Sequence, residues 1–247
     1  MRRNVLAAIA SMTVAGTIAL AWAPWASSAA SSTTSACGTT YAPVLDPANF
    51  VAVIDNPYFP LPVGRTLVYQ GVRDGQTQTD TVTVTGQKRN ILGIQTTVVN
   101  DVATHGSSLL EKTLDFYAQD ATGNVWYLGE NTTAYLPNGK TDTSGSFIAG
   151  VNGAEPGIIM EANPQIPDAY RQECAAGQAE DTAWVVGTTG SVSVTYGKMR
   201  NVLSTLEATR VEPGSYDEKV YAPGIGIVRE QALTGTQEFA QLVSVSG

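Results

Sequence analysis

Three carboxylates interrupt a segment whose other residues are typical of β-strands. Glu111, Asp115 and Glu130 lie within LLEKTLDFYAQDATGNVWYLGEN, residues 109–131. Acidic residues are depleted in strands, so three of them on one ribbon form either a solvated outer face or a site. As a site, they would supply oxygen ligands for a calcium-type ion, or an acid–base pair that cleaves a glycosidic bond. The sequence leaves their separation open and does not choose between these chemistries.

The tetrapeptide DATG, residues 120–123, predicts a tight hairpin turn with its glycine in the left-handed conformation. In the register that this turn favours, Asp115 opposes Leu128 and Thr113 opposes Glu130. Directly opposed residues share a face of the ribbon. The three carboxylates are therefore predicted to lie on one face, and a one-residue change of register would move Glu130 to the other.

Large side chains share the predicted face with the carboxylates and argue against an open surface, although a solvated outer face stays the first interpretation and a covered site the second. Lys219 and Tyr221, which precede the turn at residues 222–226, are further candidates for contact with a ligand. The residues predicted to bind a ligand are Glu111, Asp115, Tyr117, Trp126, Glu130, Lys219 and Tyr221. Glu111, Asp115 and Glu130 are also the candidate ligands of a calcium ion, with Lys219 or proton uptake as the other ways to relieve their repulsion.

Several other chemistries are excluded. His105 is the single histidine and lies in a turn-like segment, so a histidine-rich zinc site is impossible and a Ser–His–Asp triad is not expected. No Gly-x-Ser-x-Gly elbow is present, and Ser144 and Ser146 belong to an ordinary loop. The glycines mark turns rather than a phosphate-binding loop.

The first 29 residues have the features of a secretory signal peptide. A basic start, MRRN, precedes the apolar run VLAAIASMTVAGTIALAWAPWA and a small-residue exit, and cleavage is expected after Ala29. An uncleaved membrane anchor is the main alternative. A lipid anchor on Cys37 is less favoured, because the residues before it match a lipoprotein cleavage site poorly. We therefore expect a secreted, extracellular protein with no transmembrane segment after cleavage.

The chain is acidic, with 14 Lys and Arg against 22 Asp and Glu, and signal cleavage removes two of the arginines. Nucleic acids and anionic membranes bind clustered cations, so neither is an expected partner. Cys37 and Cys174 predict one disulfide in an oxidising compartment. Bridged cysteines supply neither a thiol nucleophile nor a soft-metal site. A monomer is expected.

The remaining sequence predicts one all-β domain. Residues 30–45 form an expected flexible arm, and residues 46–247 alternate β-branched and polar residues between Gly-marked turns. This pattern predicts a curved antiparallel sheet or open barrel with at most one or two short helices. Residues 137–181 are rich in Gly, Pro and Asn and are interpreted as an insertion that covers one face of the sheet. Within it, Pro167–Ala176 is the candidate for a short helix.

Four segments resemble a family of uncharacterised secreted bacterial proteins that is common in actinobacteria. They are DNPYFPLPVG, DFYAQDATGNVWYLGE, GAEPGIIM and YAPGIGIV, the last at residues 221–228. The order of the β segments is more loosely similar to periplasmic lipoprotein carriers and related open barrels. The first resemblance implies no activity, and the second implies only a curved sheet around a hydrophobic cavity.

Two functions fit these observations. The favoured one is a soluble secreted binding protein, which holds a small-molecule, lipid or glycan ligand on the concave face of the sheet. The alternative is a carboxylate-dependent hydrolase that acts on glycans. The absence of a nucleophile motif favours the binding protein, and the sequence does not decide whether the chain is an enzyme.

Overall fold

The computed structural model describes residues 41–235 and 237–247. In this part of the chain the only helical element is a single 3-10 turn, η1 (Pro47–Asn49), and all other regular structure is β-strand. The all-β prediction is confirmed. No helix in the described residues is long and apolar enough to span a membrane. The predicted signal peptide, most of the predicted arm and Cys37 lie outside the described residues.

The first half of the fold contains five strands, most of them long: β2 (Thr66–Arg73), β3 (Gln76–Ile91), β4 (Ile94–His105), β5 (Ser108–Asp120) and β6 (Val125–Tyr135). The second half contains β12 (Asp181–Gly187), β15 (Leu203–Thr209), β16 (Tyr216–Ala222), β17 (Gly226–Ala232) and β18 (Glu238–Ser246). The shorter strands are β1 (Phe50–Val51), β7 (Thr141–Asp142), β8 (Phe147–Ile148), β9 (Glu155–Met160), β10 (Ala169–Arg171), β11 (Glu173–Cys174), β13 (Ser191–Val194) and β14 (Gly197–Arg200).

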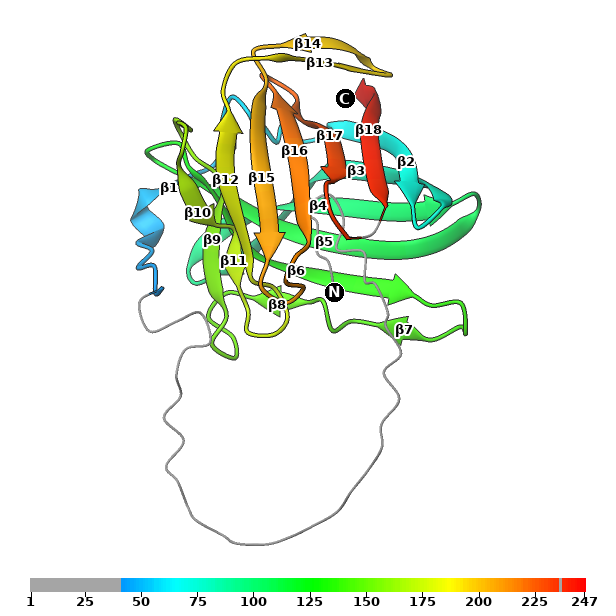
Figure 1. Cartoon of the computed structure of the whole chain (residues 1–247). Coiled ribbons are helices and arrows are strands. Elements are labelled where there is room, and N and C mark those ends of the chain that lie inside the picture. The colour runs from blue at the N-terminus through cyan, green and yellow to red at the C-terminus, as the bar shows by residue number, and fades with distance from the viewer. Residues whose placement is uncertain (1–40, 236) are drawn as a thin grey trace, which may run out of the picture.

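Sixteen strands form one antiparallel sheet that is nearly closed and barrel-shaped, in which the main strand order is β10-β12-β15-β16-β17-β18-β2-β3-β4-β5-β6-β9-β11. The pairing of β18 with β2 joins the two halves. Figure 1 shows β12, β15 and β16 standing upright in front of β3 to β6, which cross behind them. The β13–β14 hairpin is a separate two-stranded sheet at one end of the barrel.

The main core lies between these two crossing layers. Alternate residues of each strand point inward, as in β2, where Leu67 and Tyr69 are buried. They pack in the same cluster as Val220 of β16 and Leu242 of β18. A second, smaller cluster around Phe116 and its neighbours is formed by the other faces of β4 to β6. The barrel therefore has a hydrophobic core in its interior and a second hydrophobic cluster on the outer face of β4 to β6.

The segment 137–181 is more regular than the sequence predicts. It contributes strands β7, β8 and β9, which pair with β6, and β10, which pairs with β12. The helix expected at Pro167–Ala176 is wrong, because this stretch forms β10 and β11. Backbone pairing with β12 and β9 satisfies its polar groups, and this tertiary context overrides a weak local helix preference.

The described end of the predicted arm is fixed to the barrel. The hydroxyl group of Tyr41 donates a 2.8 Å hydrogen bond to the carbonyl oxygen of Pro156 in β9. The guanidinium group of Arg171 in β10 lies 5.2 Å from the centre of the Tyr41 ring. Tyr41 thus bridges β9 and β10.

Candidate functional site

The β5–β6 hairpin has the predicted turn but a different register. Gly123 has a φ of 100°, as the DATG turn requires, and Asp115 pairs with Glu130 instead of Leu128. The register shifts between Phe116 and Tyr117, where β6 carries one extra residue. Gly129 lies at this bulge with a φ of 144°, a conformation that favours glycine. The pairing is already one residue from the prediction beside the turn, where Tyr117 pairs with Tyr127, and the bulge adds the second residue of the shift.

The one-residue shift beside the turn exchanges the aromatic residues of β6 between the two faces. Tyr127 pairs with Tyr117 and stacks on its ring, with 4.9 Å between the ring centroids. Trp126 instead packs against the outer cluster, and its indole nitrogen donates a 2.9 Å hydrogen bond to Asp120. Trp126 and Leu128 therefore do not share a face with the carboxylates, and that part of the prediction is wrong.

The three carboxylates do lie on one face, and that face is the interior of the barrel. Glu111, Asp115 and Glu130 are at most 5 % exposed, so the interpretation as a solvated outer face is wrong. Part of the 137–181 segment lies beside them in the same sheet, and its role as a cover over this face stays a prediction. Phe147 of β8 pairs with Glu130, and its ring contacts the ring of Tyr127 edge-on at 5.4 Å.

Lys219 and Tyr221 belong to a different interior cluster. The ammonium group of Lys219 lies 2.6 Å from Oε2 of Glu207, and Tyr221 donates a 3.2 Å hydrogen bond to Oε1 of the same carboxylate. Lys219 is almost fully buried, at 1 % exposure. Burial alone would lower its pKa, but the carboxylates of Glu207 and Glu230 raise it above its usual value. Lys219 is therefore a buried cation that neutralises Glu207.

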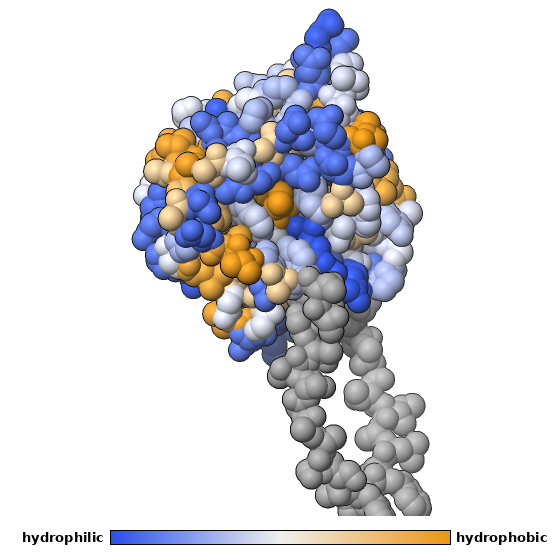
Figure 2. Space-filling model, turned by 90° about the vertical axis from the view of Figure 1, so that its left-hand side faces the viewer, coloured by the Kyte–Doolittle hydropathy of each residue, from blue (hydrophilic) through white to orange (hydrophobic). Residues whose placement is uncertain are grey.

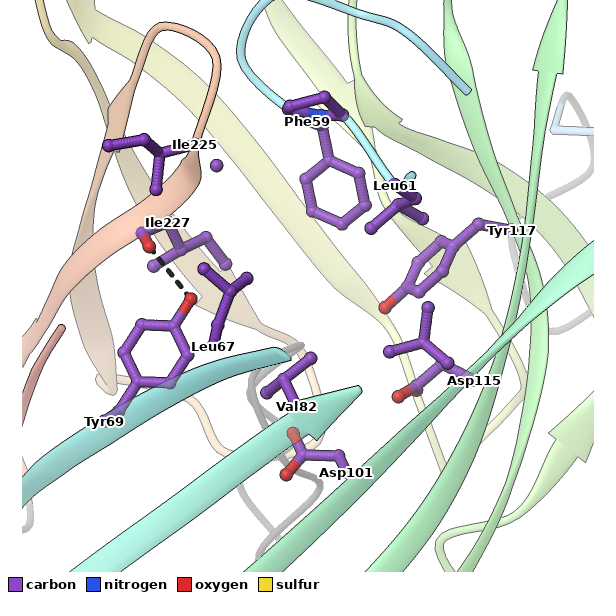
Figure 3. A pocket seen from close by; sticks show the side chains of 13 residues that line it. Phe59, Leu61, Leu67, Tyr69, Val82, Asp101, Asp115, Tyr117, Ile225 and Ile227 are labelled. Atoms are coloured by element: carbon purple, nitrogen blue, oxygen red, sulfur yellow. Dashed lines mark hydrogen bonds between the residues drawn. The ribbon is translucent and has the colours of Figure 1, made fainter. Parts of the chain in front are cut away.

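A pocket opens into the barrel between two loops. One wall is formed by Phe59, Pro60 and Leu61 of the proline-rich loop, and the facing wall by the β16–β17 turn at Ile225 and Gly226 (Figure 3). Its enclosed volume is about 30 Å³, and the value reaches about 430 Å³ only when space open to solvent is included. The other lining residues are Leu67, Tyr69, Val82, Val99, Asp101, Asp115, Tyr117 and Ile227.

The two rim loops are hydrogen-bonded to each other. The amide of Gly224 donates to the carbonyl oxygen of Pro57 at 2.8 Å, and the guanidinium group of Arg65 donates to the carbonyl oxygen of Gly224 at 3.0 Å. Deeper in the pocket, Tyr69 uses its hydroxyl group to donate to the carbonyl oxygen of Ile227. The mouth is therefore closed by a few hydrogen bonds between the loops, and the Tyr69 hydrogen bond to Ile227 holds the wall deeper in the pocket.

Two aspartates lie at the inner end of this otherwise apolar pocket (Figure 3). Burial raises the pKa of Asp115 to about 7, although the hydrogen bond from Tyr127 opposes this change. Burial also raises the pKa of Asp101 well above its usual range, and the nearby carboxylates of Asp80 and Asp115 raise it further. The pocket thus combines apolar walls with weakly acidic groups at its floor.

The described residues contain no cluster of three or more His, Cys, Asp or Glu side chains arranged to hold a metal ion. Calcium binding by Glu111, Asp115 and Glu130 therefore stays a prediction without support from this geometry. His105 is exposed at the end of β4, and its Nδ1 lies 2.6 Å from the carbonyl oxygen of Thr77. It contacts no carboxylate of the pocket.

Of the seven residues predicted to bind a ligand, Asp115 and Tyr117 line the pocket, and Glu111 and Glu130 lie beside them on the same face. Most of the pocket was missed: Phe59, Leu61, Tyr69, Asp101, Ile225 and Ile227. One signal was present in the sequence. Asp101 occupies an inward position of a strand between Val99 and Ala103, where a carboxylate is unusual.

The surface on the β1 and β10 side of the barrel mixes hydrophilic and hydrophobic side chains. Figure 2 shows this face with a hollow near its centre that has a hydrophobic side chain on its floor. The hydrophobic groups do not form one continuous exposed area on this face. A mixed surface of this kind gives no sign of an extensive protein interface.

No protein-family model matches the sequence, and a comparison with curated proteins found no match. Among solved structures, the fold is similar to a Bacteroides fragilis protein with a YmcC-like fold that is inferred to be exported. The TM-score is 0.46 at 16% identity, over 78% of this chain and 100% of that one. A protein from Parabacteroides distasonis, inferred to be a lipoprotein, gives a TM-score of 0.41 at 13% identity, over 77% of this chain and 99% of that one. These comparisons do not test the resemblance to secreted actinobacterial proteins, which stays a prediction.

Proposed function

We propose that this chain is an exported binding protein that holds a small, largely apolar ligand inside the barrel. The observation that carries the proposal is the pocket between Phe59–Leu61 and Ile225–Ile227. Small-molecule sites are concave and mostly apolar with a few polar groups, and this pocket has that lining; its enclosed volume is about 30 Å³, so the rim loops must separate to admit a ligand. The signal-like N-terminal sequence supports export.

The lining favours an apolar ligand over a carbohydrate. Each Å² of apolar surface that a ligand buries here contributes about 25 cal/mol to binding. Sugar hydroxyl groups would find few partners among Leu, Val, Ile and Phe side chains, and each unpaired hydroxyl would cost about 1–3 kcal/mol. The enclosed position of the carboxylates argues in the same way against the glycan hydrolase, since a glycan chain needs an open cleft around its scissile bond.

The rim explains how a ligand would enter an enclosed interior. The two loops are joined by the bonds between Gly224, Pro57 and Arg65, which are near the surface. Separating the loops breaks these bonds and leaves the strand ladders intact. Entry therefore requires only a local opening, of the kind that loops undergo on a microsecond scale or faster.

Binding of an apolar fluorescent probe, N-phenyl-1-naphthylamine, tests the proposal on the chain that begins at residue 30. We expect saturable fluorescence enhancement with the wild-type protein. Ile225→Arg places a charge at the mouth and should weaken binding by on the order of tenfold. Leu233→Arg is the matched control, because Leu233 is exposed and does not line the pocket. Equal binding by both variants, or no binding by the folded wild type, would contradict the proposal.

A further inference from the structure

One oxygen atom at the pocket floor has no hydrogen-bond partner among the described residues. It is Oδ1 of Asp101, a side chain that is 2 % exposed and lines the pocket. Figure 3 shows this carboxylate at the inner end of the pocket, on the same side as Asp115. A buried carboxylate oxygen without a donor is costly, and a folded protein usually supplies a donor or leaves the place for a ligand.

The charged groups around Asp101 do not relieve it. Those that act on it are carboxylates from three strands, Asp80 of β3, Glu111 and Asp115 of β5, and Glu230 of β17. The two buried cations of the described chain are engaged elsewhere: Lys219 pairs with Glu207, and Arg73 lies 4.0 Å from Glu238. The field at the pocket floor therefore favours a positive charge, and no side chain of the described part delivers one to Asp101.

We propose that the ligand carries a protonated amine at one end of its apolar body, and that Asp101 and Asp115 hold this ammonium group. This inference rests on the proposed function and specifies the ligand class. An ammonium group brings one positive charge and three donors, which match an orphan oxygen and two adjacent carboxylates. A hydroxyl group brings one donor without charge, and a carboxylate would be repelled.

The same geometry couples ligand binding to proton release. Without a ligand the two floor carboxyls hold protons near neutral pH, because burial and the neighbouring carboxylates raise the pKa values of Asp101 and Asp115. An ammonium group stabilises the ionised form, so each carboxyl that pairs with it gives up its proton to the solvent. Affinity for an amine should consequently rise between about pH 5 and pH 8.

Calorimetric titration with octylamine, 1-octanol and octanoate tests the inference, because the three probes share a chain length and differ in the head group. At pH 8 we expect octylamine to bind at least about tenfold more tightly than 1-octanol, the lower bound for a hydrogen bond to a charged group. Octanoate should bind most weakly. Titrations in two buffers of different ionisation enthalpy should show proton release for octylamine alone.

Asp101→Asn should reduce the preference for octylamine over 1-octanol to about twofold or less and leave 1-octanol binding unchanged. It removes a buried ionisable group, so the variant should fold, which thermal unfolding checks. Asp74→Asn is the matched control, since Asp74 is exposed in the β2–β3 turn with a φ of 48° that asparagine tolerates. Equal affinity for octylamine and 1-octanol in the wild type would overturn the amine inference alone. Failure of all three probes to bind the folded protein would overturn the proposed function as well.

Discussion

The hydroxyl group of Tyr127 donates a 2.7 Å hydrogen bond to Oδ1 of Asp115, across the β5–β6 pair and inside the barrel. This bond connects the pocket floor to a series of packed rings, because Tyr127 stacks on Tyr117, which contacts Phe59 at the mouth. A continuous series of contacts therefore joins Asp115 at the pocket floor to Phe59 at the rim.

Stability should fall as the pH rises from about 4 to about 7. Burial raises the pKa values of Asp115 and Asp80 from 3.8 to about 7, so the folded state holds more protons than the unfolded state in this window. Unfolding free energy then decreases by about 1.4 kcal/mol per pH unit for each such proton. Urea titrations at pH 5 and pH 8 measure this difference. Asp115→Asn should flatten the profile, and a stability that rises with pH would contradict the assignment.

Lys219→Met should destabilise the fold by about 3–5 kcal/mol, because it leaves Glu207 charged and buried without its cation. The double variant Lys219→Met/Glu207→Gln removes both charges and should recover most of this loss. Urea unfolding at pH 7 compares the two. If the double variant were as unstable as the single one, packing of the lysine stem rather than charge pairing would be the main contribution.

Gly129→Ala should cost about 1–3 kcal/mol, since the φ of 144° is strained for any residue with a side chain. A Cβ at this position would also lie 2.5 Å from the carbonyl oxygen of Phe147. Gly86→Ala in β3 is the control, because its Cβ would meet only Val63 at 3.7 Å. Thermal unfolding should separate the two variants by several degrees. Equal melting temperatures would show that the bulge does not need glycine.

Arg65→Ala should make the pocket mouth open more often. It removes the 3.0 Å hydrogen bond to the carbonyl oxygen of Gly224, a bond that contributes about 0.5–1.5 kcal/mol. Stopped-flow fluorescence with the naphthylamine probe should show faster association and dissociation, each by a few-fold, with a nearly unchanged equilibrium constant. Arg200→Ala, at an exposed position of β14, should leave both rates as they are.

Cys174 should form a disulfide with Cys37, which lies outside the described residues. Cys174 is fully buried at the start of a loop beside β9, and the expected bridge would stabilise the protein by at most about 4–5 kcal/mol. Intact mass of the non-reduced protein should be two hydrogens below the reduced value. Alkylation of both thiols in the native secreted protein would exclude the bridge.

The sequence was sufficient for the fold class and for the grouping of the carboxylates. Alternation predicts the strands of β2 to β6, and the DATG turn places Asp115 near Glu130. Beyond the bulge, the observed pairing differs from the predicted one by two residues, since Asp115 pairs with Glu130 and not Leu128. A shift by an even number of residues leaves every side chain on its predicted face. Glu130 was therefore placed on the correct face from a wrong pairing, whereas the one-residue shift near the turn exchanged Trp126 and Tyr127.

The pocket could not be predicted because its walls are distant in the sequence. Phe59 and Ile225 face each other only after β18 has paired with β2 and the two layers have crossed. Local patterns carry no information about that pairing. Similarly, the strands β10 and β11 depend on partners in β12 and β9, and their own residues suggested a helix. Gly129, within LGEN, was the residue in the sequence that could have indicated the bulge.

The pairing of β18 with β2 also constrains how the chain acquires its structure during biosynthesis. Strand β2 is made early, yet its second neighbour, residues 238–246, leaves the ribosome about 170 residues later. Until then β2 has an open edge, and the strand that joins the two layers of the barrel is missing. A chain with such distant contacts folds slowly, because the entropy of closing the loop must be lost before the contacts form. Slow closure of this kind leaves the chain extended for longer than local strand pairing would.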